Sequence, residues 1–202
     1  MPTIYISISP QILCFSPNMD GHNNYVKIYK GSGCSSQVGM NGGEQGISLV
    51  GTVGTAGCWH QHPIVHEFIH AFGFYHEHMR PDRDDYVEII WKNIPEGLWY
   101  LFDKIAGTET FGVEYDGRSV MHYTSNAFTN NSFGDGNTIK SKVKIQFFKL
   151  SNVHIQLDFV IILHLQRPDL WTTEELGKAK GDWMSENDMA KLRKMYQCEE
   201  GK

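Results

Sequence analysis

The sequence predicts a single α+β domain, because two strand-like segments precede a segment with the features of a helix. Residues 25–30 alternate apolar with polar side chains, are rich in strand-forming residues and end at Gly31. Residues 46–50 form the second strand-like run. Pro63 then stands where the first turn of a helix tolerates proline. At 202 residues, the chain is long enough to bury the core of one domain.

The predicted helix carries the central motif of the chain, HEFIHAFGFYH, which begins at His66. On a helix with 3.6 residues per turn, His66 and His70 project from one face and can share an ion. His76 reaches the same ion only if the chain turns after His70, and Gly73 permits that turn. Three neutral imidazoles around Zn²⁺ leave a position open for water, as in catalytic sites. Glu67 is then placed to take a proton from that water.

A bare HExxH pattern also occurs on ordinary helices, where its side chains are merely solvated. Here the motif is extended by a glycine and a third histidine, and a methionine follows in the run Ser119–Tyr123, which we call the Met-turn. The residues after the third histidine read EHMRPDRDDYV. With these features the chain resembles one metzincin family in particular, the astacins, over roughly residues 25–139 and 174–198.

The resemblance implies a zincin-like catalytic domain in two parts. A twisted mixed sheet and a zinc-binding helix would lie above the active-site cleft, with a more irregular C-terminal part below it. The implied function is that of a secreted zinc-dependent endopeptidase with one Zn²⁺ per chain, held by His66, His70 and His76. Its substrates would be extended protein or peptide segments, and residues 46–50 would form an edge strand that pairs with them.

The resemblance also assigns roles to three side chains around the metal. Glu67 would accept the proton of the metal-bound water and pass it to the leaving amine. Tyr123, two residues after the methionine, would donate a hydrogen bond to the oxyanion that forms during cleavage; the alternative is a buried aromatic residue without a catalytic role. Met121 would form an apolar floor beneath the imidazoles, because a thioether is a poor zinc ligand among harder donors.

The four cysteines indicate two disulfides and an oxidising, extracellular compartment, since none forms a CxxC pair. They allow three connectivities, of which the resemblance implies Cys34–Cys58 and Cys14–Cys198. Residues 1–10 lack the basic start and unbroken apolar core of a secretion signal. Residues 1–24 do not follow the family pattern, so we expect a truncated or replaced N-terminus. In the family a processed N-terminus is buried near the glutamate after the third histidine, here Glu77.

Charge and hydropathy exclude nucleic-acid binding and a membrane span. A net charge of −5 and a pI near 6.0 leave no basic footprint for nucleic acid. The apolar run 159–165 is too short to span a bilayer. The charged residues 82–85 are expected to be solvated or to form structural ion pairs, and His60 and His62 to be surface or capping residues. The oligomeric state is not indicated.

Two later segments carry further expectations. The stretch around Trp99, Phe102 and Ile105 is amphipathic and is predicted to be a core-facing helix. Residues 143–166 are an atypical insert without a family counterpart. They begin with valine and end with glutamine, whose codons can match intron borders, so one hypothesis is a retained intron. The alternative is a genuine surface insertion, and the dominant cDNA would decide between them.

Two other functions stay open at this point. The chain could be a zinc-binding but inactive, protease-like interaction module, which casein cleavage that disappears in Glu67→Ala would exclude. It could also be a structural protein whose histidines never bind a metal. A stoichiometric zinc measurement separates that structural role from the other two.

Overall fold

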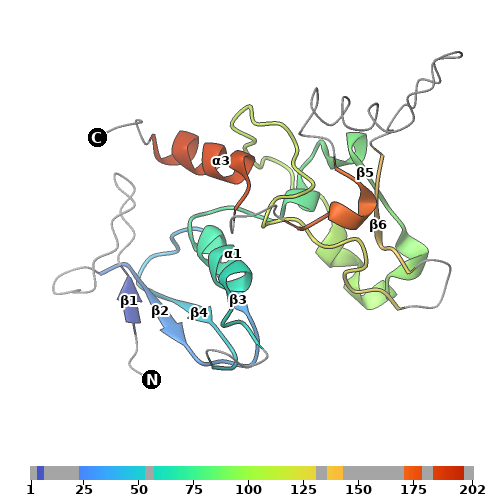
Figure 1. Ribbon diagram of the computed structural model, residues 1–202. Coiled ribbons are helices and arrows are strands. Elements are labelled where there is room, and N and C mark those ends of the chain that lie inside the picture. The colour runs from blue at the N-terminus through green and yellow to red at the C-terminus, as the bar shows by residue number, and fades with distance from the viewer. Residues whose placement is uncertain are drawn as a thin grey trace, which may run out of the picture.

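The structure is a computed structural model that describes residues 23–52, 57–130, 136–142, 171–178 and 184–197, together with the backbone of residues 4–6 (Figure 1). The predicted insert 143–166 lies outside the described residues, as do Cys14 and Cys198. The described part combines a mixed sheet with helices, so the α+β prediction is confirmed. Within that part, none of the helices has the length and apolar character that crossing a membrane requires.

The first part of the molecule is built on a four-stranded sheet in the order β1-β2-β4-β3. The strands are β1 (Ile4–Ile6), β2 (Tyr25–Tyr29), β3 (Ser35–Ser36) and β4 (Glu44–Ser48). β2 and β4 run parallel, whereas β1 and β3 are antiparallel to their neighbours, which makes the sheet mixed. The two predicted strands correspond to β2 and β4, while β1 lies in a region for which the sequence indicated no strand.

The prediction that residues 46–50 form an edge strand is wrong. β4 lies between β2 and β3, and β3 pairs with Ile47 and Ser48. Beyond the strand, Val50 forms two hydrogen bonds with Cys58. The Val50 N–H donates to Cys58 Sγ at 3.2 Å, and the Val50 carbonyl accepts from the Cys58 N–H at 2.9 Å. Cys58 also forms a disulfide with Cys34, which directly precedes β3, so the start of β3 lies beside this segment. In the described sheet, the edge on this side is therefore β3.

Helix α1 (Gln61–Ala71) covers this sheet and contacts β3 and β4 (Figure 1). Pro63 lies in its first turn, as predicted. The buried side chains between helix and sheet are Val26, Ile47, Leu49, Cys58 and Ala71. Because apolar side chains on one face of the helix meet those on one face of the sheet, burial fixes how α1 is oriented.

The second part of the molecule contains a smaller sheet and several short helices. Strands β5 (Val87–Ile89) and β6 (Ile139–Ser141) pair antiparallel. The 3₁₀ helices are Glu77–Met79, Arg83–Asp85, Trp91–Asn93, Glu96–Phe102 and Thr173–Glu175. Their shared core consists of Val87, Ile89, Ile94, Phe102, Tyr115, Ile139, Trp171 and Leu176. Short helices and loops thus dominate this half, as the resemblance implied.

The predicted amphipathic helix is only partly correct. Residues Glu96–Phe102 are a 3₁₀ helix, which ends before Ile105. Phe102 is fully buried, but 41% of Trp99 is exposed, and its indole N–H donates to the Ile94 carbonyl at 3.1 Å. Three residues per turn place different side chains inward than the α-helical period assumed from the sequence.

Helix α3 (Glu186–Tyr196) contacts both parts of the molecule. It begins with a capping box, in which Ser185 accepts from the N–H of Asp188. A third core joins α1, the Met-turn and α3 through the buried side chains of Ile69, Phe72, Val120, Met121 and Leu192. Residues far apart in sequence are therefore packed around the C-terminal half of α1.

Candidate metal centre

Three histidines converge at the C-terminal end of α1. His66, His70 and His76 each offer one ring nitrogen, and these atoms all lie within 4.8 Å of one another. The Nε2 atoms of His66 and His76 are 3.1 Å apart. The ring of His70 stands edge-on to both, with centroid distances of 4.6 Å to His66 and 4.7 Å to His76. The three rings thus face one point, as predicted from their spacing.

Backbone carbonyls orient two of these rings. Nδ1 of His66 donates to the Val120 carbonyl at 2.8 Å, and Nδ1 of His70 donates to the Phe74 carbonyl at 2.7 Å. Since a carbonyl oxygen can only accept, Nδ1 carries the proton and Nε2 keeps its lone pair. Burial lowers the pKa of His66 to about 4 and lowers the pKa of His70 and His76 as well. Neutral imidazoles with free Nε2 atoms fit a zinc ion.

Glu67 lies beside the histidines and is nearly fully buried. Its Oε2 atom has no hydrogen-bond partner among the described residues. Burial without a partner raises the pKa of this carboxyl to about 7. A buried carboxylate with a free oxygen and a pKa near neutrality can accept and return a proton.

A turn after α1 brings His76 back to the other two ligands. The helix ends at Ala71, and Gly73 adopts a φ of 105°, a conformation that favours glycine. Its N–H donates to the His70 carbonyl at 2.8 Å. Directly after His76, the N–H of Glu77 donates to the Met121 carbonyl at 2.8 Å. The third ligand is therefore fixed both by the glycine turn and by the Met-turn.

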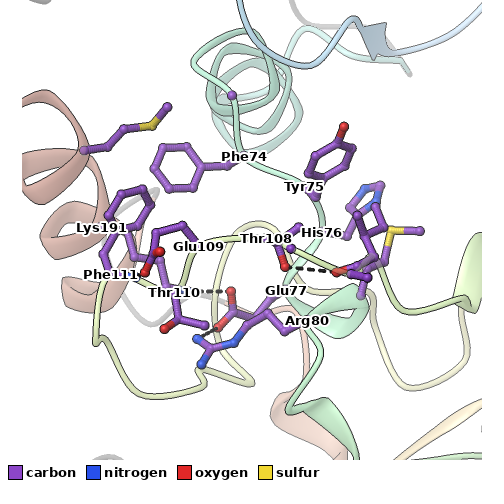
Figure 2. A pocket seen from close by; sticks show the side chains of 16 residues that line it. Phe74, Tyr75, His76, Glu77, Arg80, Thr108, Glu109, Thr110, Phe111 and Lys191 are labelled. Carbon is purple, nitrogen blue, oxygen red and sulfur yellow. Dashed lines mark hydrogen bonds and ion pairs between the residues drawn. The ribbon is translucent and has the colours of Figure 1, made fainter.

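The side chain of Glu77 anchors this segment to the second part of the molecule. It is buried and forms ion pairs with Arg80, at 3.0 Å, and with Lys191 of α3. The Asp116 N–H donates to the same carboxylate at 3.0 Å. Glu77, Arg80 and Lys191 line a cavity of about 410 Å³. Figure 2 shows them in its wall, with Phe74 and Phe111 on another side. The sequence had not indicated Lys191.

Asp188 supports the Met-turn from the start of α3. Its carboxylate accepts from Ser119 Oγ at 2.5 Å and from the Val120 N–H at 2.9 Å. Val120 is the residue whose carbonyl orients His66, so Asp188 acts on the metal centre through one residue of the Met-turn. The sequence had not indicated this role of Asp188. The capping-box spacing of Ser185 and Asp188, which marks the start of a helix, was the available signal.

Tyr123 lies next to the metal centre. Its ring is 4.6 Å from the ring of His76, and it is partly exposed rather than fully buried. Burial, together with the nearby Tyr100 and Glu67, raises the pKa of its phenol to about 12. The hydroxyl therefore keeps its proton at neutral pH and can donate a hydrogen bond.

The other singled-out residues do not belong to the cluster of three ring nitrogens, although the ring of His62 stacks on that of His66 at a centroid distance of 6.4 Å. Cys34 and Cys58 form a disulfide. His60 and His62 are exposed, and His60 precedes α1 without a side-chain capping bond. In the charged run 82–85, Arg83 is buried and forms an ion pair with the exposed Asp84, so structural ion pairs account for part of this run.

Comparisons with known proteins agree with this geometry. Residues 11–154 match the model of the astacin peptidase family. The chain is similar to zinc metalloproteinase nas-6 of Caenorhabditis elegans, with 44% identity over 60% of this chain and 35% of that protein. It is 34% identical to nas-7 of the same species, over 91% of this chain and 39% of the relative. It is 35% identical to meprin A subunit beta of Rattus norvegicus, over 88% of this chain and 21% of that protein.

A solved structure is also similar. High choriolytic enzyme 1, a hatching enzyme zinc-protease from Oryzias latipes, superposes with a TM-score of 0.66 at 27% identity. The match covers 89% of this chain and 72% of the solved chain. The matched regions span only about a third of the length of the first relatives, 35% of nas-6 and 39% of nas-7.

Proposed function

Because the chain belongs to the astacin peptidase family, we propose that it is a zinc-dependent endopeptidase that cleaves extended protein or peptide segments. One observation carries this proposal. The three ring nitrogens of His66, His70 and His76 lie within 4.8 Å of one another beside the buried carboxylate of Glu67, whose Oε2 has no hydrogen-bond partner among the described residues. A closed structural site would not place an unpaired carboxylate next to the ligands.

His66, His70 and His76 would hold the ion through their Nε2 atoms, because Nδ1 of the first two is already bound to carbonyl oxygens. A bound zinc would polarise the scissile carbonyl and lower the pKa of a coordinated water. Three protein ligands leave the position that such a water needs.

Glu67 acts as the general base in this proposal. Its free Oε2 accepts the proton of the attacking water, and the protonated carboxyl then delivers that proton to the leaving amine. Its raised pKa, about 7, suits a group that takes and returns a proton near neutral pH. Tyr123, whose phenol stays protonated, donates a hydrogen bond to the developing oxyanion.

The edge strand β3 gives the substrate a place to bind. A strand at the edge of a sheet presents unpaired backbone groups, with which an extended peptide can pair without particular side chains. β3 follows Cys34 directly, and the disulfide to Cys58 ties it to the segment that enters α1. Such a disulfide supports secretion, since disulfides persist in oxidising compartments.

Cleavage of a denatured protein such as casein tests the proposal. We expect the intact chain to bind one zinc per chain and to cleave, whereas Glu67→Gln keeps the zinc and loses activity by roughly a thousandfold or more. Glu88→Gln, which changes an exposed glutamate on β5, is the matched control and should keep activity. If the intact chain binds zinc but does not cleave, the inactive interaction module is the better description.

A further inference from the structure

His78 lies directly behind the ring of Tyr123. It is fully buried, and the two rings stack with a centroid distance of 4.1 Å and an interplanar angle of 30°. Among the described residues, the other rings around Tyr123 are farther away, with centroid distances of 4.6 Å to His76, 5.3 Å to Phe128 and 5.7 Å to Phe102. His78 is thus the ring on which the phenol rests.

Hydrogen bonds hold His78 in this position. Its Nε2 donates to the Leu101 carbonyl at 3.0 Å. Its own carbonyl accepts from Arg83 Nη1 at 3.0 Å, and the same nitrogen donates to the Phe102 carbonyl at 2.5 Å. Ring and backbone are therefore both tied to the 3₁₀ helix Glu96–Phe102, so the imidazole cannot shift without breaking these bonds.

An oxyanion donor works only if its hydroxyl lies within hydrogen-bond distance of the developing charge. Tyr123 is partly exposed, and its ring can rotate about two side-chain torsions unless neighbouring groups restrict it. A flat, immobile group against one face of the ring restricts that rotation. The stack also orients the phenol relative to His76, whose ring lies on the metal side.

We propose that His78 is a positioning residue for Tyr123, whose flat imidazole, fixed by the Leu101 carbonyl, holds the phenol where it meets the oxyanion. This inference rests on the proposed function, in which Tyr123 donates to the oxyanion. The side chain acts through Tyr123 and does not touch the substrate. Nε2 of His78 donates to the Leu101 carbonyl, and His78 is not one of the three histidines whose ring nitrogens cluster.

Two substitutions separate positioning from simple core packing. His78→Leu fills most of the space without a flat face or a donor, and we expect kcat to fall roughly tenfold while KM and zinc content stay unchanged. His78→Gln offers a flat amide that can still donate to the Leu101 carbonyl, and we expect it to retain kcat to within about twofold. If His78→Leu does not fold, His78→Met, which also lacks donor and flat face, takes its place.

The decisive comparison repeats the substitution in a Tyr123→Phe background, where the hydroxyl is missing. We expect Tyr123→Phe alone to lower kcat, and His78→Leu to cause no further fall in that background. An equal fall in both backgrounds, or kcat unchanged by His78→Leu in the intact chain, would overturn the inference. Failure of the proposed function looks different, because the intact chain would then not cleave, or Glu67→Gln would cleave as well as the intact chain.

Discussion

The Nδ1–H of His66 donates to the carbonyl of Val120, 54 positions later in the chain, at 2.8 Å. On its other side, Val120 donates its N–H to Asp188 of α3 at 2.9 Å. A metal ligand on α1 is thus oriented by a Met-turn residue, which a carboxylate at the start of α3 holds in place. Such outer contacts keep a ligand in one tautomer and one orientation before the metal binds.

Replacing that carboxylate should weaken zinc binding. Both carboxylate oxygens of Asp188 accept hydrogen bonds, one from Ser119 Oγ and the other from the Val120 N–H. In Asp188→Asn an N–H₂ group replaces one of these oxygens and cannot accept, so Ser119 or Val120 loses its acceptor. We expect the dissociation constant for zinc to rise by roughly 10- to 100-fold, measured by competition with a chromophoric chelator. Ser185→Ala removes the cap of the same helix and serves as control, with lower stability but unchanged zinc affinity. Unchanged affinity in Asp188→Asn would contradict the role of this relay.

The pH dependence of cleavage should report Glu67. Burial raises its pKa to about 7 in the metal-free site, and the positive charge of a bound zinc lowers it again. A general base acts only when ionised, so kcat/KM should rise with pH and reach its plateau at or below about pH 7. The profile is measured with zinc content followed at each pH, because protonated histidines release metal. An activity that increases towards acidic pH would exclude Glu67 as the base.

His122 should make the metal-free protein less stable in acid. It is buried, its Nδ1 donates to the Tyr123 carbonyl at 2.6 Å, and its Nε2 accepts from the Tyr115 hydroxyl at 2.7 Å. Burial lowers its pKa from 6.5 to about 4. Between these two values the unfolded chain therefore binds more protons than the folded chain, so stability falls as pH decreases.

The size of this effect can be measured with urea. From about pH 7 to about pH 5, His122 alone should contribute a loss of about 2 kcal/mol in the free energy of unfolding. The other buried histidines add losses of the same sign. His122→Asn, whose amide can still donate to the Tyr123 carbonyl, should show a smaller decrease over the same range. A decrease as large as in the intact chain would show that His122 is not responsible.

The Cys34–Cys58 disulfide should contribute substantially to stability. It closes a loop with a sequence separation of 24, which restricts the unfolded chain. The loop-entropy relation gives a stabilisation of about 3.5 kcal/mol for a loop of this length. Urea unfolding of the double variant with serine at both positions measures it, with the single variants as controls for a free thiol. A change below about 1 kcal/mol would mean that the unfolded chain is already restricted there.

Part of the site could be predicted from the sequence because it depends on local geometry. The spacing of His66 and His70 fixes both rings on one face of any helix, and Gly73 marks the turn that returns His76. The neighbouring carboxylate of Glu67 follows from the same helical geometry. No knowledge of distant segments is needed for these residues.

The supporting contacts could not be predicted because they join distant segments. Val120, Asp188 and Lys191 approach the metal centre only after α1, the Met-turn and α3 pack together. The stack of His78 on Tyr123 likewise joins residues that are far apart in the chain. The edge strand was misassigned for a similar reason, since β3 is too short for a periodic signal and is placed by the disulfide before it.

The X-ray absorption spectrum at the zinc edge, recorded on the purified chain, tests the three-histidine site most directly. We expect one zinc per chain with nitrogen and oxygen neighbours at about 2.0–2.1 Å and the scattering pattern of three imidazoles. His70→Ala should remove one imidazole from that pattern or abolish binding. A chain without bound zinc, or a spectrum with sulfur neighbours at about 2.3 Å, would contradict a catalytic metal centre formed by His66, His70 and His76.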